Sequence, residues 1–301
     1  AQSISYFITL LLCFLLVIRQ TSSFKFQWNK LFAFLILKKS LPYALLIFLM
    51  TIYYRIDSIM LERMIDDDAR QAGIYAQAYR FFEASNMFAY LFAALLLPIF
   101  SRMLKLKQSV FEIVNFSFNT LMLFALILSV FSCFFSYDII NLRYDNYIAE
   151  SSNIFMVLMM CFICVASTYI YGTLLTANGN LFYLNIVAAF GVVLNVVLNL
   201  ILIPKYAAFG SAVASLVTQF LTGLAQVFLC IYIFKFNLYR TFFKLLVFII
   251  GLVLFTYYIK DIEMHLYFKL IMYLIFSLIW IFIMQIVKIS DFSMLIQNRL
   301  K

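Results

Sequence analysis

The sequence is short of charged residues, glycine and proline. Only 12% of its 301 residues are charged and 66% are hydrophobic, and it holds 7 glycines and 3 prolines. Soluble domains are about half apolar and about a quarter charged, so this composition excludes an ordinary soluble domain. The scarcity of glycine, of proline and of alternating polar and apolar residues also argues against an outer-membrane β-barrel. The composition therefore predicts an all-α, polytopic helical membrane protein.

Motifs of metal, nucleotide and thiol chemistry are also scarce. His265 is the only histidine, and the pair Cys161 and Cys164 has no second pair to complete a zinc site. None of the seven glycines precedes a lysine, so the sequence has no Walker A loop. Residues 66–68 contain an Asp-x-Asp pattern, but they lie in a short acidic turn without a soluble domain to hold a nucleotide sugar. We expect no metal, no cofactor and no enzymatic activity.

Long apolar runs occupy most of the chain. A membrane-spanning helix needs about 20 mainly apolar residues, and we predict nine such spans. They lie at residues 3–18, 41–61, 74–98, 114–136, 153–176, 181–203, 211–234, 242–259 and 266–287. Residues 24–37 are too short and too basic to span, and they predict an interfacial amphipathic helix with Trp28 at the lipid headgroups.

The basic residues are distributed unequally between the two sides of the predicted membrane domain. If the first span ends in the cytoplasm, fourteen lysines and arginines fall on that side and five on the other. Cytoplasmic loops carry the excess of basic residues, so the C-terminus is predicted to be cytoplasmic. The formal net charge of +9 reflects this topology, and we expect no nucleic-acid partner.

Four ionisable residues interrupt the apolar runs of the first predicted hairpin. They are Arg55, Asp57, Arg80 and Glu83. An ionisable side chain in the bilayer costs several kcal/mol unless it is paired or faces water, and it usually marks a route for a substrate or an ion. We predict a layer of charges that lines a cavity. The alternative is a buried ion-pair cluster that only fixes helix packing.

Helical periodicity assigns these charges to faces. Thr51 lies on the same face of the first helix as Arg55, whereas Asp57 points about 200° away from Arg55. Tyr90 lies on the same stripe of the second helix as that helix's two charged residues. Thr51 and Tyr90 are therefore added to the candidate site.

The hairpin resembles a known family of transporters. The resemblance is carried by Pro42, the Tyr-rich Arg-x-Asp stretch at 53–57, the acidic turn at 66–68, Gly-x-Tyr-x-x-Ala at 73–78, and Leu-Pro followed by Ser-Arg at 97–102. These features resemble the seventh and eighth helices of the polysaccharide repeat-unit flippases. This family contains the O-antigen and capsule translocases of the multidrug/oligosaccharidyl-lipid/polysaccharide (MOP) exporter superfamily.

A second block resembles the eleventh and twelfth helices of the same family. It covers residues 176–219, and Asn195, Asn199, Pro204 and Gly210 fall where the family has an Asn-rich span and a Pro-Lys/Gly turn. The resemblance extends over about residues 40–290. It implies a MOP-type flippase fold of which this chain holds the sixth to the fourteenth helices.

This resemblance, with a chain that begins without Met at an apolar run, implies missing N-terminal spans. We expect residues 1–20 to be the last helix of a missing N-terminal lobe and residues 21–40 to be a cytoplasmic interfacial linker helix. Residues 41–234 are expected to form a C-terminal six-helix lobe. Residues 235–301 are expected to form two additional helices and a cytoplasmic tail.

The family resemblance also implies a substrate. Members flip undecaprenyl-pyrophosphate-linked oligosaccharide repeat units across the bacterial inner membrane for surface polysaccharides such as O-antigen and lipopolysaccharide. Arg55 and Arg80 would bind the pyrophosphate bidentately, and Asp57, Glu83, Thr51 and Tyr90 would complete the site. A basic cytoplasmic rim would attract the headgroup, and it consists of Lys38, Lys39, Arg102, Lys105 and Lys107. Expected partners are membrane lipid, a polysaccharide polymerase and a chain-length regulator.

Two other functions stay open at this point. A multidrug exporter of the same superfamily would use a roomy pocket lined by Met and aromatic residues, with Asp57 or Glu83 for cation coupling. A membrane-embedded polysaccharide polymerase would carry a large outer loop, and the predicted outer loops are short.

Two polar stripes also admit two interpretations. Asn185, Asn195 and Asn199 share one face of a predicted span, and the next span has such a face running from Ser211 to Gln226. Small and amide side chains of this kind hold membrane helices together. They would equally suit contacts with sugar hydroxyl groups.

Overall fold

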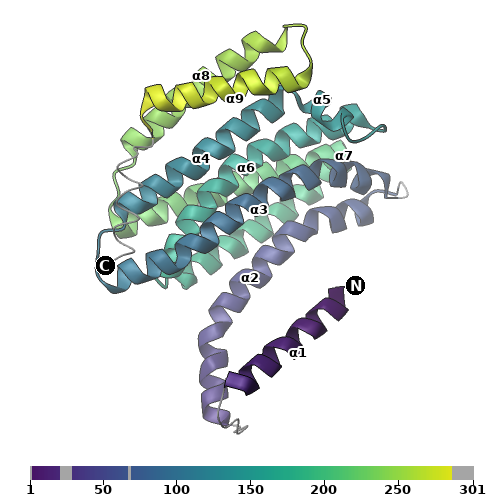
Figure 1. Ribbon diagram of the computed structural model, residues 1–301. Helices are drawn as coiled ribbons and strands as arrows, with labels where there is room; N and C mark the ends of the chain where they lie inside the picture. The colour runs from purple at the N-terminus through teal and green to yellow at the C-terminus, as the bar shows by residue number, and fades with distance from the viewer. Residues whose placement is uncertain (1, 21–28, 67–68, 287–301) are drawn as a thin grey trace. The chain divides into compact units, whose positions relative to one another are not determined.

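The computed structural model describes residues 2–20, 29–66 and 69–286. Regular structure in these residues is helical throughout (Figure 1), which confirms the predicted all-α class. The helices are α1 (Gln2–Gln20), α2 (Lys30–Met64), α3 (Arg70–Lys105), α4 (Phe111–Phe134), α5 (Ser136–Asn141), α6 (Ile148–Ala177), α7 (Leu181–Phe234), α8 (Tyr239–Lys260) and α9 (Leu266–Met284).

The chain divides into two compact units, Ala1–Pro42 and Tyr43–Lys301. Pro42 lies inside α2 at this division, where its ring removes one helical hydrogen bond. Residues 30–37 form the first turns of α2, so the described part of the predicted interfacial helix continues directly into the following span. Trp28 lies outside the described residues. The division of the chain into lobes and a linker stays a prediction.

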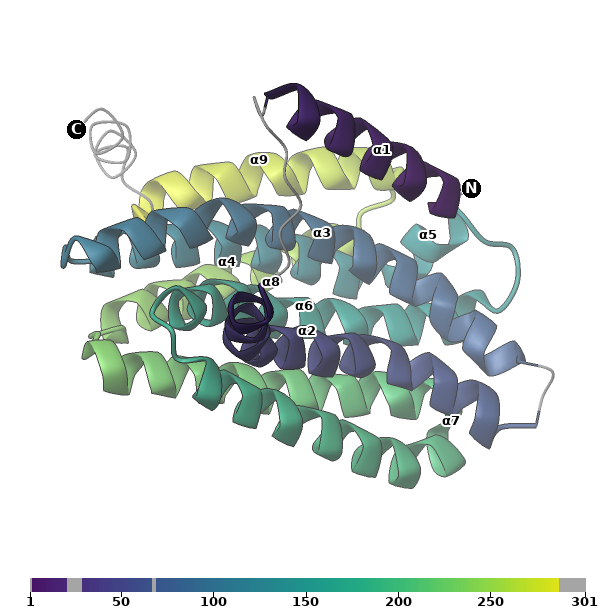
Figure 2. The same ribbon diagram turned by 90° about the horizontal axis from the view of Figure 1, so that it is seen from below.

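The long helix α7 accounts for two predicted spans. Its 54 residues are more than twice the length that one span requires. Ala207 breaks the helix with a φ of 49° and a ψ of −132°, three residues after Pro204. Across the break, Asn195 Nδ2 lies 3.5 Å from Ser215 Oγ. The two halves therefore lie antiparallel (Figure 2), as expected for spans at 181–203 and 211–234.

Seven described helices are long and apolar enough to cross a membrane. Because α7 supplies two spans, these helices correspond to eight of the nine predicted spans. The remaining predicted span, at residues 3–18, corresponds to α1, whose apolar part Ile4–Gln20 is shorter than the other candidate spans. The six-residue helix α5, in the connection between α4 and α6, has no counterpart among the predicted spans.

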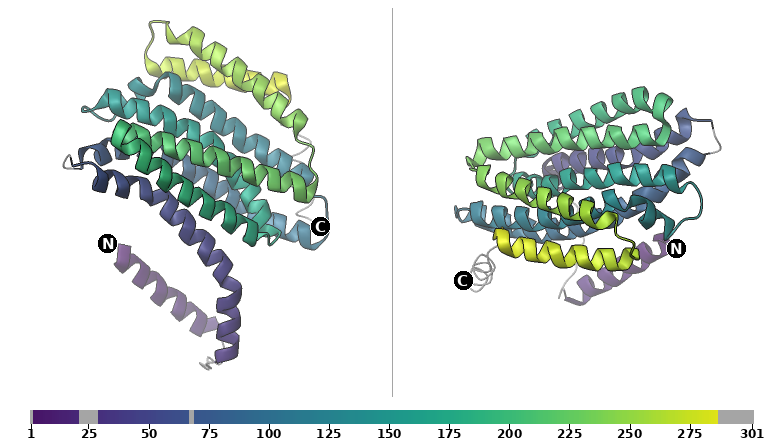
Figure 3. Two further views of the ribbon diagram at one scale, coloured as in Figure 1. Left: turned by 180° about the vertical axis from the view of Figure 1, so that it is seen from behind. Right: turned by 90° about the horizontal axis from the view of Figure 1, so that it is seen from above.

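Helix α6 is central to the second unit, because it packs against α3, α4 and α7. Helices α8 and α9 form a pair next to α4 at one edge of this unit (Figure 3). Tyr273 Oη of α9 donates a hydrogen bond to the carbonyl oxygen of Ile127 in α4, at 2.8 Å. The backbone of α2 makes few close approaches to other helices, whereas each helix from α3 to α9 has at least one neighbour whose backbone is close.

We expect the variant Gly210→Ala to accumulate poorly as a folded protein. A Cβ atom at this position would lie 2.5 Å from the carbonyl oxygen of Leu202, a backbone atom that cannot rotate away. Overpacking of this kind costs about 1–3 kcal/mol or more. The control is Gly73→Ala, because an added Cβ there meets no atom within 4 Å. Size-exclusion profiles in detergent measure the effect, and equal monomer peaks for both variants would contradict the hairpin geometry.

Candidate functional site

The structure separates Asp57 from the other predicted charges. Asp57 is on the inward face of α2 and is only 3% exposed. Arg55, two residues earlier on the same helix, is exposed, as are Arg80 and Glu83 on α3. The predicted layer of four charges is therefore divided, since helical geometry turns two residues of α2 in nearly opposite directions.

Asp57 is held by neutral side chains from three segments of the bundle. Tyr75 Oη of α3, at 2.9 Å, and Ser215 Oγ of α7, at 2.5 Å, both donate to Asp57 Oδ2. Asn199 Nδ2, in the first half of α7, donates to Asp57 Oδ1 at 2.8 Å. The same nitrogen also lies 3.0 Å from Asn195 Oδ1. The carboxylate thus receives three hydrogen bonds, none of which comes from a basic residue.

This cluster offers oxygen atoms to a monovalent cation. Asn199 Oδ1 is buried and has no hydrogen-bond partner. Asn195 Oδ1 lies 3.0 Å from Asn199 Nδ2, and Ser215 Oγ lies 3.5 Å from Asn195 Nδ2. A buried carboxylate requires a compensating positive charge or a proton, because charge without either is costly in a low-dielectric interior. Among the described residues, no three His, Cys, Asp or Glu side chains gather into a metal cluster.

Arg80 is paired with an aromatic residue. Its Nη1 atom donates to Tyr144 Oη at 3.4 Å, from α3 to the loop after α5. The guanidinium of Arg143 lies over the Tyr144 ring, 5.9 Å from its centroid. A guanidinium has five N–H donors, so Arg80 keeps donors for an anion. Within the described part of the chain, Arg80 bonds to a tyrosine hydroxyl and forms no ion pair with an acid.

The residues predicted for the cytoplasmic rim are all exposed. Lys38 and Lys39 lie on the part of α2 that belongs to the first unit. Arg102 and Lys105 are in the last turn of α3, and Lys107 follows that helix. Their role as a rim stays a prediction.

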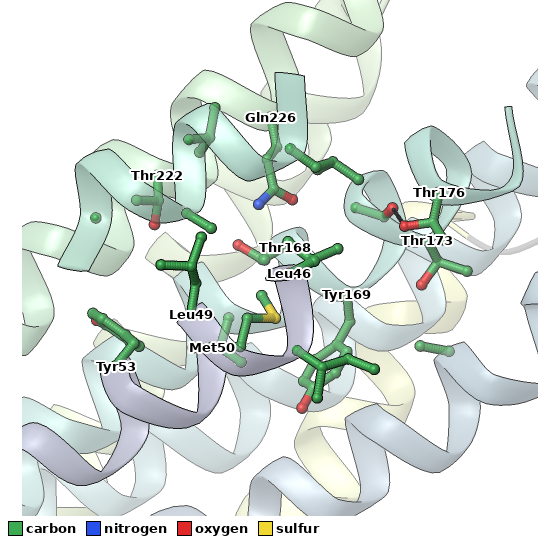
Figure 4. Close-up of a pocket in the computed structure, with 18 of the residues that line it drawn as sticks. Leu46, Leu49, Met50, Tyr53, Thr168, Tyr169, Thr173, Thr176, Thr222 and Gln226 are labelled. Atoms are coloured by element: carbon green, nitrogen blue, oxygen red, sulfur yellow. Dashed lines mark hydrogen bonds between the residues drawn. The ribbon is translucent and has the colours of Figure 1, made fainter. Parts of the chain in front are cut away.

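A cavity of about 450 Å³ lies between α2, α3, α6 and α7 (Figure 4). Its walls are mainly apolar, with four tyrosines, five threonines and two glutamines among them. These are Tyr53, Tyr54, Tyr90, Tyr169, Thr51, Thr168, Thr173, Thr176, Thr222, Gln219 and Gln226. Thr51 and Tyr90 are therefore brought together in one cavity. The four predicted charged residues are not in its walls.

Asp57 borders a second, much smaller cavity. Asp57, Tyr75 and Ser215 line this space, which shares Tyr53, Tyr54 and Gln219 with the large cavity. Tyr53 Oη also donates to the carbonyl oxygen of Ser215, at 3.3 Å. These three shared side chains form the partition between the large cavity and the carboxylate.

Comparisons with known proteins bear on the fold. No protein-family model matches the sequence, and no curated protein matches it. A solved structure does match: the lipid II flippase MurJ in its inward closed conformation, with a TM-score of 0.67 and 17% sequence identity. The similarity covers 96% of this chain and 60% of the MurJ chain. The chain has the MurJ fold.

This result confirms the predicted fold, because the lipid II flippase MurJ shares it. The chain spans about 60% of the length of the MurJ chain that it matches. The numbering of its helices as the sixth to the fourteenth of a longer protein stays a prediction.

Sequence reasoning did not identify the partners of Asp57. It grouped Asp57 with the arginines, whereas the structure places it with Tyr75, Asn199 and Ser215. The sequence does contain part of the information needed to find these partners. Asn195 and Asn199 share a helix face, and Asp57 points away from Arg55 on α2. Neither interpretation of the polar stripes, helix packing or sugar contacts, includes a carboxylate.

Proposed function

We propose that this chain is part of a transporter that flips a lipid-linked oligosaccharide across a membrane. Its substrate in this proposal is an undecaprenyl-pyrophosphate-linked repeat unit of a surface polysaccharide. The observation that carries the proposal is the similarity to the lipid II flippase fold over 96% of the chain. One fold can host several activities. The choice of an anionic substrate therefore rests on the charged side chains of the site, Arg55 and Arg80.

The exposed arginines support an anionic substrate. Arg55 and Arg80 lie on helices that are long and apolar enough to span a membrane. Placing a charged side chain in lipid costs several kcal/mol, so the face that carries them is proposed to border water or another part of the protein. A planar guanidinium binds phosphate oxygens bidentately, and a pyrophosphate offers two such groups.

The complete proposed site extends beyond the arginines. Glu83 and Thr51 would contact polar groups near the headgroup, and Tyr90 would pack against sugar or lipid. The basic residues of the predicted rim would attract the pyrophosphate. The protein would reside in the bacterial inner membrane with a cytoplasmic C-terminus, and it would exchange substrate with a polymerase and a chain-length regulator. Its role in this proposal is transport without catalysis.

We infer that Asp57 is the coupling site rather than a direct sugar ligand. Its carboxylate is buried among neutral donors, one of which is Nδ2 of Asn199, and Oδ1 of the same asparagine has no hydrogen-bond partner. A sodium ion or a proton would neutralise the carboxylate at this position. Exchange of that cation along its gradient would provide the energy for flipping.

One observation favours a multidrug exporter as the second candidate function. The large cavity has Met50 and four tyrosines in its walls and no charged side chain. Such a lining suits a neutral or weakly polar aromatic compound. Asp57, behind the partition, would then couple drug export to the same cation.

Complementation of a flippase-null bacterium distinguishes the two functions. We expect the full-length protein, expressed at a matched membrane level, to restore surface polysaccharide and to leave sensitivity to cationic drugs unchanged. The readouts are a polysaccharide gel and growth inhibition by the drugs. Drug resistance without polysaccharide would contradict the flippase proposal and support the exporter.

A further inference from the structure

A polar stripe connects the buried carboxylate with the large cavity. It runs along one face of the second half of α7 and consists of Ser215, Thr218, Thr222 and Gln226. Ser215 donates to Asp57 at one end, and Gln226 lines the cavity at the other. Eleven residues at 1.5 Å per residue separate these ends, a distance of about 16 Å.

Beyond Ser215, the hydroxyl groups of the stripe bond within their own helix. The hydroxyl of Thr218 donates to the carbonyl oxygen of Ala214, and that of Thr222 donates to the carbonyl oxygen of Thr218, each at 2.8 Å within α7. Gln226 is 4% exposed, and its Oε1 atom has no hydrogen-bond partner. An unpartnered buried acceptor is costly, so the side chain gains a hydrogen bond if it turns toward water in the cavity that it lines.

Two glycines let α6 and the first half of α7 pack closely against the stripe. A Cβ atom on Gly172 of α6 would lie 2.8 Å from Gln226 Oε1. A Cβ atom on Gly191, in the first half of α7, would lie 2.9 Å from Thr222 Cγ2. Both glycines line the cavity. A larger side chain at either position would therefore fill the space next to the polar face.

The cavity extends toward one end of the helices. Leu97, Thr176 and Leu184 line it, and each lies within about two turns of the end of α3, the end of α6 or the start of α7. In the predicted orientation this is the cytoplasmic end of the lobe.

We propose that this cavity is hydrated and is the route by which the coupling cation passes between Asp57 and that end of the lobe. The proposal rests on the proposed coupling role of Asp57. Neutral hydroxyl and amide oxygens in the cavity walls, among them those of Thr222 and Gln226, solvate a small monovalent cation, and the absence of charge from these walls means that they do not retain it. Tyr53, Tyr54 and Gln219 form the last barrier before the carboxylate.

Cysteine labelling tests whether the stripe is hydrated. In the full-length protein without its native cysteines, Thr222→Cys is compared with Phe220→Cys, which lies on the opposite, exposed face of α7. The probe is the impermeant cation trimethylammonium-ethyl methanethiosulfonate, applied to membrane vesicles of each orientation. Because a thiol reacts as the thiolate and apolar surroundings suppress that form, we expect labelling of Thr222→Cys to be at least about tenfold faster. If Thr222→Cys and Phe220→Cys are labelled at equal rates in both vesicle orientations, the proposal is overturned.

A cavity-filling change separates the route from the cation site. Adding Gly191→Leu is expected to reduce labelling of Thr222→Cys to the Phe220→Cys rate, and Gly191→Leu alone is expected to lower polysaccharide transport at least tenfold at matched protein level. Gly73→Leu, in open space, is the control. If Gly191→Leu blocks labelling but transports normally, the route is wrong while the coupling role of Asp57 stands. If Asp57→Asn transports normally, the coupling role is wrong, and the route with it.

Discussion

The variant Asp57→Asn is expected to abolish transport while the protein stays folded in the membrane. Asparagine keeps the shape of the side chain, and the hydroxyls of Tyr75 and Ser215 can rotate to accept a hydrogen bond from its amide. The substitution removes only the negative charge that would hold a cation. Loss of one partner of a buried charge pair costs about 2–5 kcal/mol, which corresponds to a decrease of about 30-fold or more in cation affinity.

The matched control is Asp138→Asn. Asp138 lies exposed on α5, so the same chemical change there should leave transport unaffected. The measurement is surface polysaccharide in flippase-null cells, at protein levels matched by immunoblot. Wild-type polysaccharide from the Asp57→Asn variant would rule out a coupling role for this carboxylate.

Replacing Arg55 or Arg80 by lysine is expected to impair transport nearly as much as replacing it by alanine. Lysine keeps the charge but lacks the planar fork that binds two phosphate oxygens at once. A hydrogen bond to a charged group contributes about 1.5–3 kcal/mol, so losing one or two lowers transport roughly 10- to 100-fold. Arg63, exposed near the end of α2, is the control for both substitutions.

A charge exchange tests the alternative that these residues only stabilise the helices. If Arg80 and Glu83 act as an interchangeable ion pair, the double variant Arg80→Glu with Glu83→Arg should recover both protein level and transport. We expect it to recover protein level alone, because Arg80 is hydrogen-bonded to Tyr144 rather than to an acid. Normal polysaccharide from both arginine-to-alanine variants would end the proposal of pyrophosphate binding.

The sequence predicts the helices well because hydropathy is a local property. Apolar runs of sufficient length predict the spans of α2, α3, α4, α6, α7, α8 and α9, and Pro204 with Gly210 indicates the reversal inside α7. Where α2 begins is harder to predict from the sequence. Lys38 and Lys39 suggested an interface, yet the backbone there continues as a helix through Pro42. Basic residues thus indicate where a membrane surface is expected, and they do not end a helix.

The candidate site was predictable only in part, because its contacts are distant in the sequence. Periodicity correctly turned Asp57 away from Arg55. It could not identify the partners, since Asn199 is 142 residues away and Ser215 is 158 residues away. The direction of a side chain follows from its own helix, whereas its neighbours depend on how several helices pack. For the same reason the cavity between α2 and the other helices had no counterpart in the sequence.

The distance along the chain between Asp57 and its partners has a consequence for biosynthesis. Ribosomes add about 5–20 residues per second, so α2 emerges roughly 7–30 s before Asn199 exists. Tyr75, only 18 residues later, is available after a few seconds and is the first of the three donors. A carboxyl group in the bilayer before its donors arrive is unfavourable by about 3 kcal/mol on insertion scales. Helix α2 is therefore expected to remain at the insertion machinery, or with Asp57 protonated, until α7 has entered the membrane.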